Sequence, residues 1–174
     1  MILPKIRDPR LITIRRGGTL TDADHHLLAV WAAKCSEHVL HYFEKECPND
    51  NRPRRAIEIA RSWSNGEISV TEAKKGAYES NAAAREHNGA AKFAALSAGQ
   101  AVAVAHVAAH DLGAAGYAIR AVMAASNETD KKKKGREECR WQLDQLPEKI
   151  KELVIDDEKN RDEICWKVFQ ILER

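Results

Sequence analysis

Alanine dominates one continuous stretch of the sequence, residues 82–125, and this stretch limits the fold more than any other feature. Nineteen of its 44 residues are alanine. Four glycines lie among them: Gly89, Gly99, Gly113 and Gly116. Alanine is the strongest helix former, and small side chains let helices approach one another closely. We therefore expect two helices, at about 90–109 and 112–126, packed as a close Ala/Gly-rich pair at the centre of an all-α protein.

Helix-forming patterns continue on both sides of the alanine stretch. Apolar residues recur three and four positions apart in residues 21–46, which predicts a helix with a buried stripe that includes Trp31. Ser69 and Glu72 have the spacing of a capping box, so a further helix should begin there. Later helices are expected at about 130–146, 148–154 and 157–172. The predicted fold is a compact bundle of about six to seven helices, with residues 21–174 as a single domain.

Residues 1–20 differ in composition from the rest of the chain. Pro4 and Pro9 interrupt a mixture of apolar and basic residues, and the pair Gly17-Gly18 follows them. This pattern predicts an extended N-terminal arm that lies across the helical body. The segment has no continuous apolar run, so we expect no export signal and a cytoplasmic protein.

The composition is that of a globular protein without a strong overall charge. The chain is 44% hydrophobic and 31% charged, and its formal net charge of +2 favours neither nucleic acid nor a membrane as a partner. The lysine run 131–134 is followed by Glu137 and Glu138, which is typical of a solvated helix face. The longest uncharged run, 93–110, is mostly alanine and too weakly apolar to span a bilayer. The four cysteines form no CxxC pair, so we expect reduced thiols.

The pair His106 and His110, followed by Asp111, is the pattern closest to a metal site. Histidines four positions apart lie on one side of a helix and can share a metal ion. The metalloprotease motif requires glutamate directly after the first histidine, and Val107 stands there instead. Two interpretations remain. The histidines are either polar residues hydrogen-bonded within the alanine-rich core, which we favour, or the ligands of a metal-binding bundle or enzyme. No other cofactor motif is present, and we expect no cofactor.

A second candidate site is the arginine-rich segment that contains Asp50, Arg52, Arg54 and Arg55. Guanidinium groups bind carboxylates through two parallel hydrogen bonds. The segment therefore either anchors its loop to acidic residues elsewhere in the fold or forms a patch that faces a partner.

The arginine-rich segment is also the most specific part of a resemblance to a known family. Together with Trp63 and part of the alanine stretch, it resembles a helical family of bacterial immunity proteins, the partners of polymorphic or contact-dependent toxins. The matching segments are Asp50–Glu58, Trp63, Gly66–Glu67, His106–Ala118 and Arg140–Pro147. The resemblance covers about residues 20–147.

The resemblance implies a non-enzymatic protein that binds and neutralises a cognate toxin through a surface interface. The candidate binding residues are then the two clusters described above: Asp50, Arg52, Arg54, Arg55, His106, His110 and Asp111. The expected partner is a toxin protein, and the sequence is also compatible with a homo-oligomer. Inhibitors of cationic nucleases are usually strongly acidic, whereas this chain is slightly basic. Either its acidic surface is local, or the toxin is not a basic nuclease.

Overall fold

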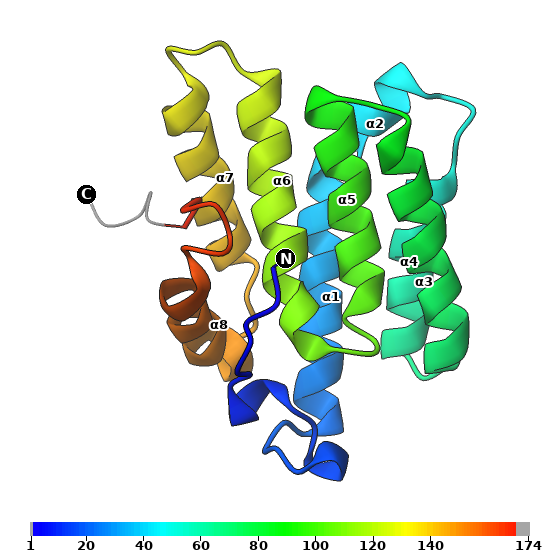
Figure 1. Ribbon diagram of the computed structural model, residues 1–174, viewed down its shortest axis with the longest axis vertical. Helices are drawn as coiled ribbons and strands as arrows, with labels where there is room; N and C mark the ends of the chain where they lie inside the picture. The colour runs from blue at the N-terminus through cyan, green and yellow to red at the C-terminus, as the bar shows by residue number, and fades with distance from the viewer. Residues whose placement is uncertain (1, 170–174) are drawn as a thin grey trace.

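The structure, a computed structural model, describes residues 2–169 and contains eight α-helices within them. They are α1 (Asp22–Val39), α2 (His41–Glu46), α3 (Arg52–Ser64), α4 (Val70–Arg85), α5 (Gly89–Ala103), α6 (Asp111–Ala125), α7 (Lys131–Asp144) and α8 (Glu148–Arg161). Three short 3-10 turns are also present: η1 (Pro9–Leu11), η2 (Ile14–Arg16) and η3 (Ala108–His110). The described residues contain no strand, and their single β-bridge joins Thr13 to Leu20. The predicted all-α bundle is therefore confirmed (Figure 1).

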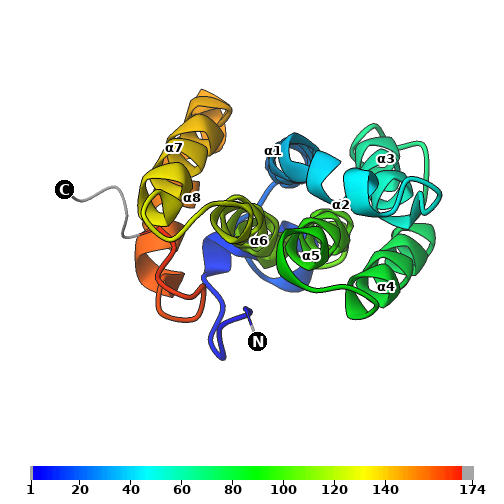
Figure 2. The same cartoon turned by 90° about the horizontal axis from the view of Figure 1, so that it is seen from above.

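The alanine-rich helices α5 and α6 lie at the centre of the bundle. Figure 2 shows them between α7 on one side and α3 and α4 on the other, and α1 packs against both. A Cβ atom added to Gly99 would lie 2.6 Å from Asn81 Oδ1, and one added to Gly113 would lie 2.5 Å from Gln100 Oε1. Those distances are shorter than a methyl group allows, so alanine at either position would have to displace the end of the Asn81 or Gln100 side chain. The expected close pair of small-residue helices is confirmed.

Larger side chains complete the core around this pair. Trp31 is fully buried, and its indole N–H donates a hydrogen bond of 2.9 Å to the carbonyl oxygen of Gln142. A buried chain of hydroxyl groups links α1, α5 and α6. Ser97 donates to the Ala114 carbonyl at 2.7 Å, which leaves Ser36 as the donor in its 2.7 Å hydrogen bond to Ser97. The predicted burial of Trp31 is confirmed.

The predicted capping box at the start of α4 is present. The Ser69 hydroxyl accepts a hydrogen bond from the Glu72 backbone N–H at 3.3 Å, and the Glu72 carboxylate accepts one from the Ser69 backbone N–H at 2.8 Å. Two N–H groups that the helix start would leave unpaired are satisfied in this way. The helix therefore begins where the sequence predicts.

Two helices end earlier than the sequence predicts. The helix expected over 21–46 is divided at Leu40 into α1 and α2, and the helix expected over 90–109 ends at Ala103. At the second site the carbonyl oxygen of Val104 lies 2.7 Å from Nε2 of His25, which donates the hydrogen bond that a longer helix would have supplied. Residues 104–107 can therefore leave the helix without losing a partner for this carbonyl group.

The end of the chain also differs from the prediction. A single helix, α8, replaces the two helices expected at 148–154 and 157–172. The chain turns after Arg161, with Trp166 and Lys167 in the left-handed region at φ of 60° and 57°. The Asp162 carboxylate accepts a hydrogen bond of 2.9 Å from the Phe169 backbone N–H and so stabilises this turn instead of a helix. The last residues of the predicted helix, 170–172, lie outside the described residues.

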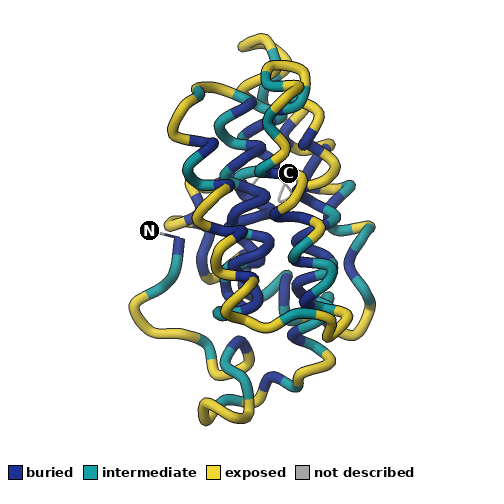
Figure 3. Tube along the Cα trace, turned by 90° about the vertical axis from the view of Figure 1, so that its right-hand side faces the viewer, coloured by how far each residue is buried: buried dark blue, intermediate teal, exposed yellow. Residues whose placement is uncertain are grey.

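The N-terminal residues 2–20 lie across one end of the bundle. Figure 3 shows this segment as mostly exposed backbone beside helices whose inner sides are buried. Its backbone is extended at Asp8, before the 3-10 turn η1, and at Ile12 and Thr13, between η1 and η2. Leu11 and Leu20 anchor the segment in the hydrophobic core. None of the helices described combines the length and the apolar character that crossing a bilayer requires.

Candidate functional site

The structure places the two predicted clusters at opposite ends of the bundle. The arginine-rich segment opens α3 next to α2 and the end of α4, whereas the histidines follow the end of α5 (Figure 1). The 15 residues of α5 separate the two ends by about 22 Å, at about 1.5 Å per residue. The two clusters therefore cannot form one site.

Most of the arginine-rich segment is bound to carboxylates of its own chain. Arg52 pairs with Asp50 at 2.6 Å and with Glu86, at the end of α4, at 3.0 Å. The side-chain hydrogen bond from Arg52 is the main cause that lowers the pKa of Asp50. Arg54 pairs with Glu44 of α2 at 2.5 Å. These contacts anchor the loop between α2 and α3, which is the first of the two interpretations offered by the sequence.

Arg55 is the exception within this segment. It is exposed, and among the described residues it has no ion pair and no side-chain hydrogen bond. Arg55 is therefore the arginine of the segment whose guanidinium is open to a partner.

The two histidines do not lie on one helix. Because α5 ends at Ala103, His106 falls in the loop and His110 in η3, with ring centroids 5.1 Å apart. His110 is held by a 2.7 Å hydrogen bond between its Nδ1 and Gln100 Oε1. Burial is the main cause that lowers its pKa to about 4, so the ring is neutral near pH 7. The expectation that His106 and His110 lie one turn apart on the same helix, as a shared metal ion would require, is therefore wrong.

No group of three or more His, Cys, Asp and Glu side chains within residues 2–169 is arranged to hold a metal ion. Among the cysteines, Cys47 has the contact closest to a nucleophile–base pair, because its Sγ lies 3.2 Å from Nε2 of His87. Burial and the charges of Glu46 and Asp50 raise the pKa of this thiol, which keeps it protonated and weakly nucleophilic.

Asp111 belongs to a buried ionic cluster. We call this the Arg161 cluster, and it consists of Arg161, Asp111, Asp157, Glu158 and Asp162, all at most 5% exposed. Arg161 pairs with Asp157 and, at 3.2 Å, with Asp111. It also donates to the carbonyl oxygens of Ala109, at 2.7 Å, and of Ile2, at 3.3 Å. The cluster therefore connects α8, the start of α6 and the N-terminal segment, and Asp111 is a structural residue rather than an exposed one.

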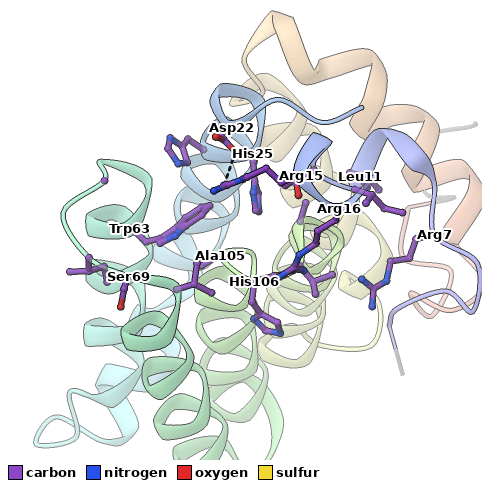
Figure 4. A pocket seen from close by; sticks show the side chains of 18 residues that line it. Arg7, Leu11, Arg15, Arg16, Asp22, His25, Trp63, Ser69, Ala105 and His106 are labelled. Carbon is purple, nitrogen blue, oxygen red and sulfur yellow. Dashed lines mark hydrogen bonds and ion pairs between the residues drawn. The ribbon is translucent and has the colours of Figure 1, made fainter. Parts of the chain in front are cut away.

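A concave site that the sequence does not reveal lies where the N-terminal segment crosses the end of the bundle. We call it the basic pocket. Its cavity of about 580 Å³ lies between the N-terminal segment, the starts of α1 and α4, the end of α3 and the loop after α5. Arg7, Arg15 and Arg16 come from the N-terminal segment, and Trp63 and His106 come from the bundle (Figure 4).

The charge of the basic pocket is mostly positive. Arg15 pairs with Asp22 at 2.9 Å. Arg16 donates a 3.0 Å hydrogen bond to the backbone carbonyl of His106 and has no carboxylate partner among the described residues. Arg7 likewise has no ion pair there. Of the predicted site residues, only His106 lines this pocket.

A family model matches most of the chain and identifies the family to which it belongs. The model for the Imm-5 like putative immunity protein matches residues 18–149, which includes helices α1 to α7. The chain therefore belongs to this family of immunity proteins, and the resemblance found in the sequence is confirmed. No curated protein and no solved structure matches the chain.

Proposed function

We propose that this protein is an immunity protein that binds a cognate bacterial toxin through its surface and neutralises it. The observation that carries the proposal is the family match over residues 18–149. Immunity by binding requires a preformed surface rather than a reaction centre. The close-packed centre of α5 and α6 supplies a rigid support for such a surface, because packing at this density resists rearrangement.

The state of the thiols also favours binding over nucleophilic catalysis. Cys35, Cys139 and Cys165 are buried, and burial raises the pKa of the last two to about 12. The pKa of Cys47 is raised as well. A cysteine acts as a nucleophile through its thiolate, so these four side chains are poorly suited to that role near pH 7.

The direct test is coexpression with the toxin candidates encoded beside the gene of this chain. Each candidate is expressed in a bacterial host with and without the chain, and growth is measured. We expect one candidate to stop growth alone and to be tolerated when the chain is present. We also expect that toxin to elute with the chain as one complex, whose mass by light scattering gives the stoichiometry and reveals any homo-oligomer.

A strongly destabilised variant is the matched control for this experiment. Trp31→Ala removes a fully buried side chain without changing the surface, so it should weaken rescue while the toxin gene and expression conditions stay the same. If wild-type chain rescues growth from none of the neighbouring toxins and forms no complex with any of them, the proposal is wrong.

The site of action that we propose is the cytoplasm, where an internal toxin would be bound. Fractionation of cells that carry the native gene tests this directly. Recovery of the chain in the periplasmic fraction would contradict it.

A further inference from the structure

The basic pocket contains more cationic side chains than carboxylates that pair with them. Arg7 and Arg16 have no carboxylate partner among residues 2–169, and Lys74 of α4 adds a third cation near His106. Asp22 is the single acidic residue in the lining, and it is already paired with Arg15. An anionic group could therefore bind the guanidinium groups of Arg7 and Arg16 without breaking an internal ion pair.

The excess of positive charge also affects the pKa of His106. Burial is the main cause that lowers its pKa, and the charges of Lys74, Arg16 and Arg7 lower it further. Its Nδ1 atom is buried without a hydrogen-bond partner in the described structure. Cations of two segments that are far apart in the sequence, the N-terminal segment and α4, thus act on the same imidazole ring.

The walls of the pocket are apolar between these charges. Leu11, Ile68, Val107 and the indole of Trp63 line it, and Val70 at its edge is 37% exposed. A ligand that presents both carboxylate groups and apolar side chains fits this lining better than a compact inorganic ion, which would leave the apolar part in contact with water.

The nearby helix end does not offer the usual phosphate cradle. Phosphate groups are commonly bound by free backbone N–H groups at the start of a helix. At the start of α4 the Ser69 backbone N–H is occupied by the Glu72 carboxylate and the Glu72 N–H by the Ser69 hydroxyl. The capping box therefore leaves neither of these two N–H groups free for a phosphate.

We propose that the basic pocket binds an acidic segment of the partner toxin, with its carboxylates at Arg7 and Arg16 and an apolar side chain against Trp63 and Val70. This inference rests on the proposed function and adds the chemistry of the partner. Opposite charge on the two surfaces accelerates their encounter and selects the correct partner. A slightly basic immunity protein is then expected, because the docking face of its toxin is acidic.

The first experiment tests the pocket without the toxin. Hexaglutamate peptide is titrated into the 15N-labelled full chain at low salt, and inorganic phosphate is titrated into a second sample. We expect the peptide to shift the backbone amide signals of residues 105–107, which line the pocket, and the shifts to disappear in the double variant R7E/R16E. Absence of peptide-induced shifts, or equal shifts with phosphate at the same concentration, would overturn the assignment to an acidic peptide.

The second experiment uses the toxin identified by growth rescue, purified with its activity removed. Binding is measured by titration calorimetry with the wild-type chain, R7E/R16E and Arg55→Glu. Arg55→Glu tests the other candidate surface, because it reverses an exposed, unpaired arginine at the other end of the bundle. We expect R7E/R16E to weaken binding by at least about tenfold, or about 1.4 kcal/mol, and Arg55→Glu to change it by less than about twofold.

The outcomes separate this inference from the proposed function. If the toxin binds wild type and R7E/R16E equally, the chain is an immunity protein that uses another surface, and the inference is wrong. If Arg55→Glu alone weakens binding, the interface lies at the arginine-rich segment. If no neighbouring toxin binds the wild type, both proposals fail. Arg7, Arg16 and Arg55 are exposed, and the hydrogen bond that these variants lose is the one from Arg16 to the His106 carbonyl, so thermal melts should show that every variant folds.

Discussion

The part of the chain that the family model matches and the parts that flank it are stabilised by different means. Helices α1 to α7 bury alanine, glycine and large apolar side chains in close contact. The flanking parts, the N-terminal segment and α8, are joined by the Arg161 cluster, in which two carboxylates pair with one guanidinium and two further carboxyl groups, Glu158 and Asp162, are buried. Apolar packing does not depend on pH, whereas a buried excess of carboxyl groups does. The flanks are therefore the pH-sensitive part of the molecule.

This difference matters for function because the flanks carry the arginines of the basic pocket. Arg7 and Arg16 belong to the N-terminal segment, and Arg161 holds that segment through its hydrogen bond to the Ile2 carbonyl oxygen. The bundle supplies the fixed wall, with Trp63 and His106. Conditions that loosen the Arg161 cluster should therefore weaken the pocket before they unfold the bundle.

The largest expected effect is in the bundle. Trp31→Ala should lower the free energy of unfolding by about 3–5 kcal/mol, because it removes a fully buried indole and leaves a cavity. The matched variant in a flank is Trp166→Ala, whose side chain is 39% exposed and stacks with Arg120 at 4.2 Å. We expect this variant to lose only about 1 kcal/mol. Urea unfolding followed by circular dichroism measures both, and equal losses would contradict the distinction between the regions.

Removal of the central charge of the Arg161 cluster should come next. Arg161→Met leaves buried carboxyl groups without their cation and should lower the free energy of unfolding by about 3 kcal/mol. We expect α8 and the N-terminal segment to detach from the bundle before the bundle itself unfolds. Hydrogen exchange should rise in residues 2–20 and 148–161 while the amides of α5 stay protected. If α5 exchanges as fast as α8, the two regions unfold together and the comparison fails.

The pH dependence of stability tests the same cluster with a smaller effect. Burial is the main cause that raises the pKa of Glu158 to about 8, and the charges of the nearby Asp111, Asp157 and Asp162 contribute to the same rise. A carboxyl group with a raised pKa contributes stability that is complete below its unfolded pKa, near about 4. That contribution is lost as the pH rises toward 8. The wild type should therefore lose stability between pH 6 and pH 9.

Glu158→Gln should reduce this pH dependence, because glutamine stays neutral at both pH values, while Asp111, whose pKa burial raises to about 7, keeps a part of it. The matched control is Glu152→Gln, an exposed position on the same helix, which should leave the wild-type pH dependence in place. Urea unfolding at pH 6 and pH 9 provides the comparison. An unchanged slope in Glu158→Gln would show that another group titrates.

The smallest predicted effect is at the capping box of α4. Ser69→Ala should cost about 1 kcal/mol, because the Glu72 N–H loses its partner. Ser69 also lies at the edge of the basic pocket. Thermal melts measure the loss, and an unchanged melting temperature would mean that water replaces the hydroxyl without penalty.

The features that the sequence predicts correctly are those that depend on local patterns. The alanine stretch predicts the central helix pair, the spacing around Trp31 predicts its burial, and Ser69 with Glu72 predicts the start of α4. Each signal lies within a few residues of the feature it specifies. The end of the chain was predicted less well, because the two helices expected at 148–154 and 157–172 are replaced by the single helix α8, which contains Asp157. Asp157 pairs there with Arg161, four residues later.

The candidate site could be predicted only in part, because its residues meet through tertiary structure. Arg16 and His106 are in contact although 90 positions separate them. No periodicity or motif connects such residues. The early end of α5 has the same origin, since it depends on His25 reaching the Val104 carbonyl from α1. The roles of Asp50, Arg52 and Arg54 as loop anchors likewise became clear only from their ion pairs.

The central claim is that this member of the immunity-protein family acts by binding a toxin. It is tested most directly by calorimetric titration of the purified wild-type chain with the inactivated toxin encoded beside its gene. We expect a saturable complex that weakens as salt is added, because the basic pocket contributes charge to it. A titration without measurable heat for every neighbouring toxin, confirmed by separate elution on gel filtration, would contradict it.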